Sequence, residues 1–288
     1  MSPRVLTVGE TMALLDPVED GPLELGRALT LRVAGAESNF AIALARLGVD
    51  VAWVSRVGDD RFGELVREAL SGEGVDLRWV QTTPGLPTGA FFKWRDGGRS
   101  HNAYYRRGSA ARTLTPADVP DEALDGVDLV HLTGITLALG DGPRALVADV
   151  ARRARDRGSL VTFDPNFRPA LWESSAAAAA AQAEVLPHVD WYLCGLEEGR
   201  GLFETEDVAT AALAAGARDV HVRGYDRTDV EVVDEVGAGD AFAAGFALGL
   251  LEGRDLDDRV RIGNVVASGA LRGTGDWETL PRRDELAL

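Results

Sequence analysis

Short apolar runs that fit β-strands alternate along this chain with longer segments whose apolar residues recur at helical spacing. Strands are expected at residues 5–9, 51–54, 129–132, 160–163, 191–193 and 219–222. Helices are expected at residues 38–47, 62–71, 143–157, 174–186, 238–251 and 259–271, and several of them end beside a glycine. Because strand–helix alternation is typical of a mostly parallel sheet covered by helices, the pattern predicts an α/β fold.

Two stretches break this alternation, at about residues 11–33 and 88–107. Both lack helical periodicity and combine glycine and proline with residues that favour strands. They are expected to form antiparallel strands outside the main sheet, as a small β-lid over one edge of the core. No repeat or linker interrupts the chain, so residues 1–288 are interpreted as one domain.

The charge balance and the cysteine content exclude several classes of protein. Lys plus Arg is 30 and Asp plus Glu is 46, which gives a net charge of −16 and disfavours nucleic acid and anionic membranes as partners. One cysteine, Cys194, cannot form an internal disulfide framework and is expected to be a buried small residue. The sequence shows neither a signal-peptide pattern nor an apolar run of membrane-spanning length, so a cytoplasmic location is expected.

The most informative motif reads DEVGAGDAFAAG over residues 234–245. A strand expected at residues 230–233 leads into a glycine-rich turn and then into an apolar helix. Free amides at such a helix start favour an anion, here a phosphate or the charge that develops during phosphoryl transfer. A carboxylate at Asp240 would repel a bound phosphate, so its natural use is to accept a proton from an attacking hydroxyl. The alternative is that Asp240 only caps the helix.

Other nucleotide-binding motifs fit this run less well. A dinucleotide fingerprint needs a third glycine and a place near the first strand, whereas Gly237 and Gly239 stand near the C-terminus without it. A Walker P-loop needs Gly-Lys-Ser/Thr, which the sequence lacks. An oxidoreductase of the dinucleotide-binding class is therefore a distant alternative.

Residues 234–245 closely resemble the C-terminal signature of the ribokinase-like (PfkB) carbohydrate kinases. Residues 34–48 resemble the N-terminal signature of that family, and residues 54–63 resemble the motif that follows it. The resemblance implies a doubly wound α/β core with a β-lid, ATP with Mg²⁺, and phosphorylation of a hydroxymethyl group. It assigns the catalytic roles to four neighbours: Asp240 as the base, and the amides of Gly237, Ala238 and Gly239 as the anion hole.

The sugar side contains two arginines, Arg106 and Arg168, each expected where a strand gives way to a loop. Arginine binds carboxylates in a bidentate way, and a neutral sugar would not need two of them, although surface ion pairs would also explain both. Together with Tyr104 they resemble the acid-sugar site of 2-keto-3-deoxygluconate kinases, apart from Phe91, where those kinases often have tyrosine. That resemblance implies six substrate contacts: Gly35, Asn39, Tyr104, Arg106, Ile135 and Arg168.

Two alternatives remain open on the substrate side. Asn39 offers a donor and an acceptor to a sugar hydroxyl, but an N-terminal cap explains it equally well. Fructokinases share the pattern of residues 164–172, so fructose is the alternative substrate.

The resemblance also implies the remaining ligands. Glu198 is expected to organise Mg²⁺, although Gly195 replaces the asparagine that usually precedes it by three residues. A nucleotide site is implied at Arg223, Gly224, Gly237, Gly239 and Asn264. A monovalent cation such as K⁺ is expected beside Asp234 and Val236 in some relatives, and a homodimer is expected through the lid.

The segment after Arg223 is shorter than the resemblance leads us to expect. Only residues 224–229 stand where family members have a β-hairpin. A catalytically impaired sugar-acid-binding homologue is therefore a further alternative, against which the retained Asp240 argues.

Overall fold

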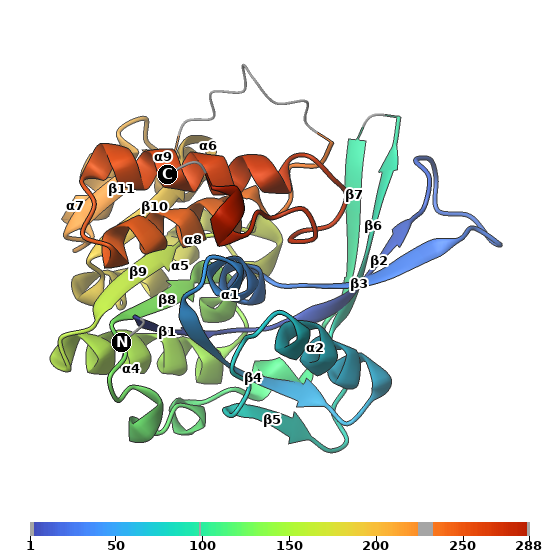
Figure 1. Cartoon of the computed structure of the whole chain (residues 1–288), viewed down its shortest axis with the longest axis horizontal. Coiled ribbons are helices and arrows are strands. Elements are labelled where there is room, and N and C mark those ends of the chain that lie inside the picture. Colours follow the sequence, from blue (N-terminus) through green and yellow to red (C-terminus); the bar gives the residue numbers. More distant parts are fainter. Residues whose placement is uncertain (1–2, 98, 224–232, 287–288) are drawn as a thin grey trace.

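The computed structural model describes residues 3–97, 99–223 and 233–286, and its main feature is a seven-stranded sheet (Figure 1). The strands lie in the order β11-β10-β9-β8-β1-β4-β5, and every neighbouring pair is parallel. Their bounds are β1 Arg4–Val8, β4 Asp50–Gly58, β5 Val80–Thr83, β8 Leu129–Thr133, β9 Leu160–Asp164, β10 Trp191–Gly195 and β11 Asp219–Arg223. The predicted α/β fold with a mostly parallel sheet is confirmed.

Helices cover both faces of this sheet, so it is doubly wound (Figure 1). One apolar core lies beneath α1 Ala36–Arg46, α2 Arg61–Gly72, α8 Ala238–Leu251 and α9 Leu256–Ala270. The core on the opposite face lies beneath α4 Asp141–Asp156, α5 Ser175–Ala183, α6 Leu196–Phe203 and α7 Val208–Ala214. A short helix, α3 Gly134–Leu137, follows β8 directly. Because helices bury both faces of this parallel sheet, its strands are expected to consist almost entirely of apolar residues.

A second sheet, the lid sheet, stands at one side of the domain (Figure 1). It has the order β3-β2-β6-β7, with bounds β2 Met12–Pro17, β3 Leu29–Ala34, β6 Ala90–Asp96 and β7 Arg99–Tyr105. The pairs β2·β3 and β6·β7 are antiparallel as predicted, but the central pair β2·β6 is parallel, and the prediction was wrong there. The reason is that β2 follows β1 and β6 follows β5, so both strands leave parallel strands of the main sheet in the same direction.

The expected element boundaries agree with the structure to within a few residues. Ser174 caps α5, since its hydroxyl accepts a hydrogen bond from the amide of Ala177 at 3.1 Å. That helix ends at Ala183 rather than at residue 186, and the 3-10 turn Leu186–His188, which contains a proline, follows it. Of the strand expected at residues 230–233, only Val233 lies among the described residues, and it is not in a strand.

Two expectations about burial and the membrane can also be compared with the structure. Cys194 is fully buried, as expected. Within residues 3–97, 99–223 and 233–286, no helix has the length and apolarity needed to cross a bilayer.

The sheet order places a topological switch beside β1, which lies between β4 and β8. Successive strands are added outward from this point in both directions, so loops at the carboxyl ends of β1 and β8 diverge there. Ligands in open α/β sheets bind in the crevice that such loops leave. At Gly134, just after β8, an added Cβ would lie 2.0 Å from the carbonyl oxygen of Pro165, so the loops after β8 and β9 are in close contact.

Candidate active site

The turn into α8 depends on Gly237, which caps the helix with a left-handed φ of 83°. A Cβ at this position would lie only 2.2 Å from the carbonyl oxygen of Asp276. Both observations require glycine here. The first helical residues are Ala238, Gly239 and Asp240. The Ala238 amide makes a long hydrogen bond of 3.4 Å to the carbonyl oxygen of Glu235, and amides in a first turn have no intrahelical partner. A helix start of this geometry is suited to bind an anion, and the anion hole itself stays a prediction.

Asp240 is not the helix cap, because that position belongs to Gly237. The Asp240 carboxylate instead accepts hydrogen bonds from two side-chain amides. Asn39 Nδ2 lies 2.8 Å from Oδ2, and Asn166 Nδ2 lies 3.0 Å from Oδ1. Asn39 comes from α1 and Asn166 from the loop after β9, so two distant segments fix both oxygens of one buried carboxylate.

The environment of Asp240 changes its acidity strongly. Burial is the main cause, and together with the charges of Asp164 and Asp276 it raises the pKa of Asp240 to about 8. The hydrogen bond from Asn39 and the positive charge of Arg168 act in the opposite direction. A carboxyl group with a pKa near neutrality is suited to accept a proton from a hydroxyl and to release it afterwards.

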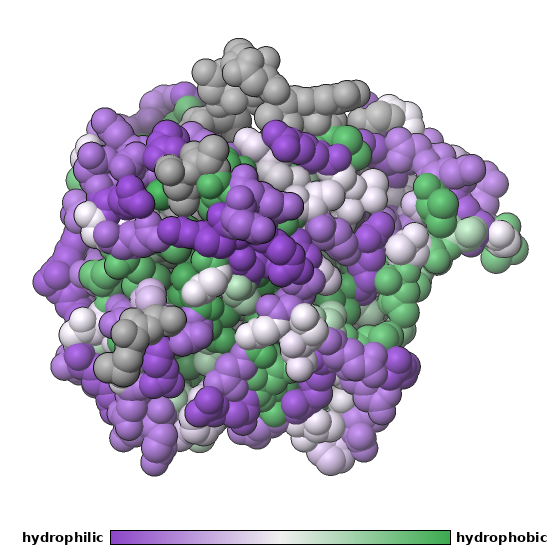
Figure 2. All heavy atoms as spheres, in the orientation of Figure 1, coloured by the Kyte–Doolittle hydropathy of each residue, from purple (hydrophilic) through white to green (hydrophobic). Residues whose placement is uncertain are grey.

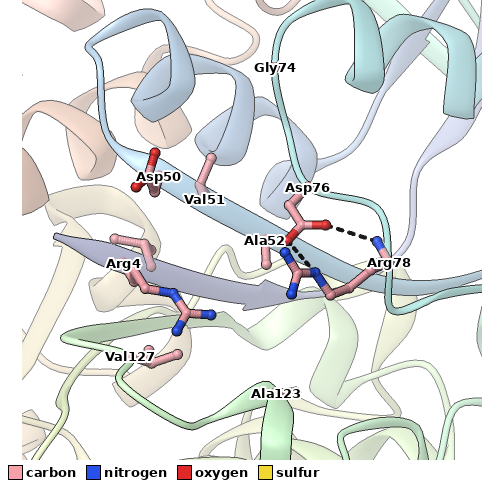
Figure 3. Close-up of a pocket in the computed structure, with 10 residues that line it drawn as sticks. Arg4, Asp50, Val51, Ala52, Gly74, Asp76, Arg78, Ala123 and Val127 are labelled. Atoms are coloured by element: carbon pink, nitrogen blue, oxygen red, sulfur yellow. Dashed lines mark hydrogen bonds and ion pairs between the residues drawn. The ribbon is translucent and has the colours of Figure 1, made fainter. Parts of the chain in front are cut away.

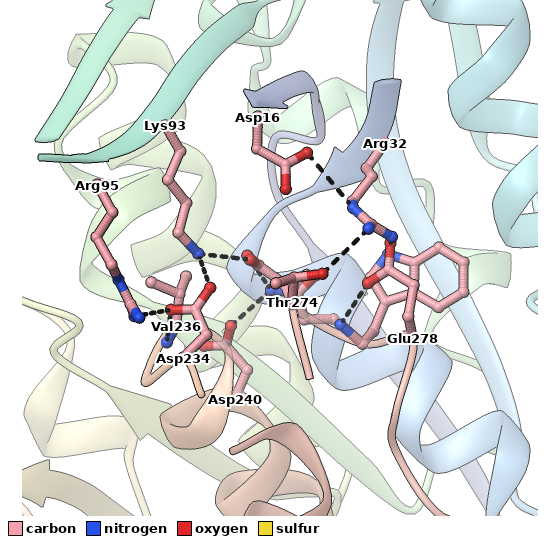
Figure 4. Close-up of polar contacts among 12 residues, drawn as sticks. Asp16, Arg32, Lys93, Arg95, Asp234, Val236, Asp240, Thr274 and Glu278 are labelled. Carbon is pink, nitrogen blue, oxygen red and sulfur yellow. Dashed lines mark hydrogen bonds and ion pairs between the residues drawn. The ribbon is translucent and has the colours of Figure 1, made fainter. Parts of the chain in front are cut away.

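Asn39 is not a helix cap either, because Gly35 occupies that position and Asn39 lies in the first turns of α1. Its Nδ2 also donates to Asp276 Oδ2 at 3.2 Å, and its Oδ1 accepts from the amide of Gly35 at 3.4 Å (Figure 4 draws the surrounding contacts). Burial raises the pKa of Asp276 to about 6. Two carboxyl groups therefore share one amide at the centre of the site.

Arg223 has a different environment from the one expected for a nucleotide ligand. Its guanidinium is buried and donates to Asp164 Oδ2 at 2.8 Å and to the carbonyl oxygen of Gly239 at 2.9 Å. It also lies over the ring of Phe242, 5.5 Å from its centroid. Arg223 thus fastens the turn into α8 to the end of β9. Gly224 lies outside the described residues.

Glu198 lies at the start of α6 beside this cluster. One carboxylate oxygen accepts from the amide of Phe167, and the other accepts from the amide of Gly195 at 3.2 Å. Burial and the nearby charge of Asp164 raise the pKa of Glu198 to about 7. The backbone at position 195 thus orients this carboxylate without an asparagine side chain.

Arg106 is buried and paired with Glu10, a residue that the sequence reasoning missed. The guanidinium donates from Nε at 2.7 Å and from Nη2 to the same carboxylate oxygen, while Ser109 donates to the other. Nη1 has no hydrogen bond to any residue that the structure describes. Glu10 follows β1 at the carboxyl edge of the sheet, and that placement was the only available signal.

The other predicted substrate residues surround the same edge of the sheet. Gly35 precedes α1, and its Cβ would lie 2.2 Å from the carbonyl oxygen of Glu10. Ile135 is the second residue of α3, which follows β8. Arg168 is exposed after β9. Its positive charge offsets part of the effect of burial, which raises the pKa of both Asp240 and Glu198. Tyr104 is half exposed on β7 and stacks on Phe91, with ring centroids 5.3 Å apart.

Asn264 lies apart from this cluster, on the exposed side of α9. It lines a hollow of about 570 Å³ between β11 and α9, together with His221, Leu256, Val260 and Val265. Asp257, Arg261 and Ser268 also line it, so both apolar and polar side chains surround the hollow.

A second hollow, of about 420 Å³, lies at the opposite edge of the sheet, where β1 and β4 begin (Figure 3). Arg4 and Arg78 line it together with Asp50 and Asp76. None of the predicted site residues contributes to it.

Sequence reasoning missed two further members of the cluster, Asn166 and Asp276. Asn166 has a φ of 39°, which non-glycine residues adopt rarely, and this strained position aims its amide at Asp240. Asp276 follows two glycines just after the last helix, and that glycine-rich turn was the available signal.

Comparisons with known proteins agree with this geometry. The chain matches the model described as "pfkB family carbohydrate kinase" over residues 2–224 and 218–283. It is 38% identical over 301 residues to 2-dehydro-3-deoxygluconokinase of Thermoproteus tenax, which covers 96% of this chain and 91% of the relative. It is 35% identical over 303 residues to the Bacillus subtilis (strain 168) protein of the same name, which covers 98% and 94%. The solved structure of the PfkB protein from Polaromonas sp. JS666 has a TM-score of 0.86 and 34% identity over 99% of each chain.

A buried carboxylate beside an anion-binding helix start, in this fold and with these relatives, defines a phosphotransferase with an alcohol group as acceptor. The chain belongs to the pfkB family of carbohydrate kinases.

Proposed function

We propose that this kinase transfers the terminal phosphoryl group of ATP to the terminal hydroxyl of a keto-acid sugar such as 2-keto-3-deoxygluconate, also called 2-dehydro-3-deoxygluconate. The observation that carries the chemistry is the pair of amides, from Asn39 and Asn166, that hold the Asp240 carboxylate next to the first turn of α8. The substrate class rests on the two relatives named above and on the two arginines at the rim of the site.

In this proposal, Asp240 accepts the proton of the sugar hydroxyl as its oxygen attacks the γ-phosphorus. The bond between the γ-phosphorus and the bridging oxygen breaks, and ADP leaves with the electron pair. The amides of Gly237, Ala238 and Gly239 stabilise the negative charge on the transferred group. Asn39 and Asn166 hold the base in place, so little reorganisation is needed when the proton moves.

For the sugar carboxylate, Arg168 offers an exposed cation at the edge of the site. Arg106 contributes through Nη1, because Glu10 holds the other side of its guanidinium. Glu10 neutralises much of the Arg106 charge, so Arg168 is the stronger determinant of carboxylate binding. Gly35, Asn39, Tyr104 and Ile135 are proposed to surround the rest of the sugar.

Mg²⁺ fits the carboxylates present only as a partly hydrated ion that the nucleotide phosphates also hold. Among the described residues, no group of three or more His, Cys, Asp or Glu side chains is arranged to bind a metal alone. Glu198, with its carboxylate fixed by two backbone amides beside Asp164, is the candidate that organises the ion and its water. When bound, Mg²⁺ would neutralise charge on the phosphates.

The nucleotide base is proposed to bind in the hollow beside Asn264, between β11 and α9. Arg223 and Gly224 remain predictions as nucleotide contacts, and the Arg223 guanidinium is already bonded to the protein. The ammonium of Lys93 contacts the Asp234 carboxylate, so the proposed mechanism needs no K⁺ ion near Asp234 and Val236.

A homodimer through the lid sheet also remains a prediction. Leu31 and Tyr105 are large and exposed on its strands, and Leu25 is fully exposed in the loop between β2 and β3. Figure 2 shows hydrophobic surface on this side of the molecule. Paired lid strands would bury it.

The experiment that tests the proposal is a coupled ATP-turnover assay with Mg²⁺ on a panel of acceptors: 2-keto-3-deoxygluconate, 2-keto-3-deoxygalactonate, fructose, ribose and adenosine. Turnover with the two keto-acid sugars alone is expected. Turnover with fructose alone would keep the kinase chemistry and remove the carboxylate argument. Sugar binding without any turnover would support the impaired homologue instead.

A further inference from the structure

Lys93 is the only lysine in the sequence, and its ammonium is directed into the active site from the lid sheet (Figure 4). It lies on β6, where side chains alternate between the two faces, and it shares the inward face with buried Phe91. Only 11% of its side chain is exposed. Its Nζ contacts the Asp234 carboxylate directly and lies 4.0 Å from Oδ1 of Asp276.

Both carboxylates that face Lys93 belong to the backbone around the anion hole. Asp234 Oδ1 accepts a hydrogen bond at 3.2 Å from the amide of Val236, which immediately precedes Gly237. Asp276 packs its carbonyl oxygen against Gly237, and its side chain shares Asn39 with Asp240. Asp276 therefore lies between the Lys93 ammonium and the helix cap Gly237, while Asp276 and Asn39 together lie between the ammonium and the base, Asp240.

The charges at this point need a cation. Asp234, Asp276 and Asp240 are each less than 10% exposed, and adjacent buried carboxylates repel one another or lose their charge unless a cation lies near them. Oδ1 of Asp276 has no hydrogen bond among the described groups. Arg95 is the second cation near Asp234, but it lies 4.0 Å away and is partly exposed. Lys93 is the buried positive charge of this cluster.

We propose that Lys93 is a positioning residue whose ammonium serves as the built-in monovalent cation of the active site and docks the lid sheet onto the anion-hole turn. The inference rests on the proposed function. Two consequences follow from the contacts. Turnover does not require added K⁺, because the carboxylates already have their cation. The turn is held in its active shape only when the lid sheet is docked, because the cation belongs to the lid sheet.

The test compares wild type with Lys93→Ala in buffers whose only monovalent cation is tetramethylammonium, Na⁺, K⁺, ammonium or propylammonium. Wild-type turnover is expected to be the same in all five. In tetramethylammonium, Lys93→Ala should lose about 100-fold in kcat while the KM for the sugar stays within about threefold, because the lost cation acts on the anion hole. Small cations that can enter the vacated space should raise the kcat of Lys93→Ala by at least about tenfold over its value in tetramethylammonium.

The matched control is Arg99→Ala, which removes one positive charge from the neighbouring strand β7. The Arg99 side chain is exposed and makes no hydrogen bond or ion pair with the described residues, so its variant should behave as wild type. A wild-type requirement for K⁺ would overturn the inference. Full kcat in Lys93→Ala, or a loss that no cation restores in a variant that remains folded, would overturn it as well.

If the wild type phosphorylates no acceptor, the proposed function fails, and the Lys93 contact is tested separately. Urea unfolding of Lys93→Met, Asp234→Asn and the double variant forms a thermodynamic cycle. Destabilisation of the double variant by clearly less than the sum of the two single variants supports the buried pair. Additive effects would overturn it.

Discussion

The side-chain amide of Asn166 lies 3.0 Å from Oδ1 of Asp240, although 74 residues separate them in the sequence. Asn166 reaches this place because the loop after β9 turns sharply, and the Asp164 carboxylate accepts a hydrogen bond from the backbone N–H of Asn166 at 2.8 Å. Arg223 holds Asp164 and the carbonyl oxygen of Gly239 at the same time. The loop after β9 and the start of α8 are thus fastened into one unit that carries the base.

Replacement of Asp240 by asparagine should abolish turnover while the fold remains. A neutral amide cannot accept the hydroxyl proton, so kcat should fall by at least about 1,000-fold. Both Asp240 oxygens accept from side-chain amides, and asparagine would turn its own NH2 group toward either Asn39 or Asn166, so one of the two hydrogen bonds is lost. The free energy of unfolding should therefore fall by about 1–3 kcal/mol, which leaves the fold intact. Kinetics and urea unfolding measure the two effects, and near-normal kcat would remove Asp240 from the role of base.

The dependence of kcat/KM on pH should show one limb that reports the titration of Asp240. The base acts only when deprotonated, so kcat/KM should rise with pH up to about 8 and fall tenfold per unit below it. The hydrogen bond from Asn39 lowers the pKa of Asp240, so Asn39→Ala should move this limb to higher pH. A profile that is flat between about pH 6 and 9 would contradict the assignment.

Loss of Arg168 should separate acidic from neutral sugars. Its charge-assisted bond to a carboxylate accounts for about 1.5–3 kcal/mol, so Arg168→Ala should lower kcat/KM for 2-keto-3-deoxygluconate by roughly 10- to 100-fold more than for fructose. Arg106→Ala should discriminate in the same direction. It should also destabilise the protein by about 3 kcal/mol, because Glu10 would remain buried without its partner. Equal losses on both sugars would refute the carboxylate role.

Gly237 should tolerate no side chain. In Gly237→Ala the new Cβ would meet the carbonyl oxygen of Asp276, so the turn must move, with a loss of more than about 2 kcal/mol of stability and nearly all turnover. Gly253→Ala is the matched control, since Gly253 also has a positive φ of 68° but has no atom within 4 Å of its Cβ position. In Gly253→Ala the free energy of unfolding should fall by only about 1 kcal/mol, and kcat should stay unchanged.

A bulky residue at position 264 should act on the nucleotide alone. Asn264→Trp would fill much of the hollow between β11 and α9, so the KM for ATP should rise about tenfold or more while the KM for the sugar stays unchanged. Steady-state kinetics with each substrate varied in turn measures both constants. An unchanged KM for ATP would place the nucleotide elsewhere.

The sequence predicted the sheet and the helices correctly, because these depend on local patterns; the role of Asp240 as the base stays a prediction. Periodicity located the strands, and the glycine-rich run located Asp240 and the anion-binding turn. The sequence could not predict which residues the polar side chains contact in the folded chain. Arg106 was expected to face a ligand, but Glu10 lies 96 residues away in sequence and pairs with it. Asn166 and Asp276 were missed for the same reason, since only the folded chain brings them to Asp240.

The single lysine has a practical consequence for the study of motion in this protein. Endoproteinase Lys-C has one cleavage site in the whole chain, and it lies in a paired strand with its side chain buried against Asp234. The rate at which the chain is cut into two fragments therefore measures how often β6 leaves the domain. Comparing the cleavage rates with and without a bound sugar would show how far the sugar shifts the opening equilibrium of the lid sheet, without any engineered label.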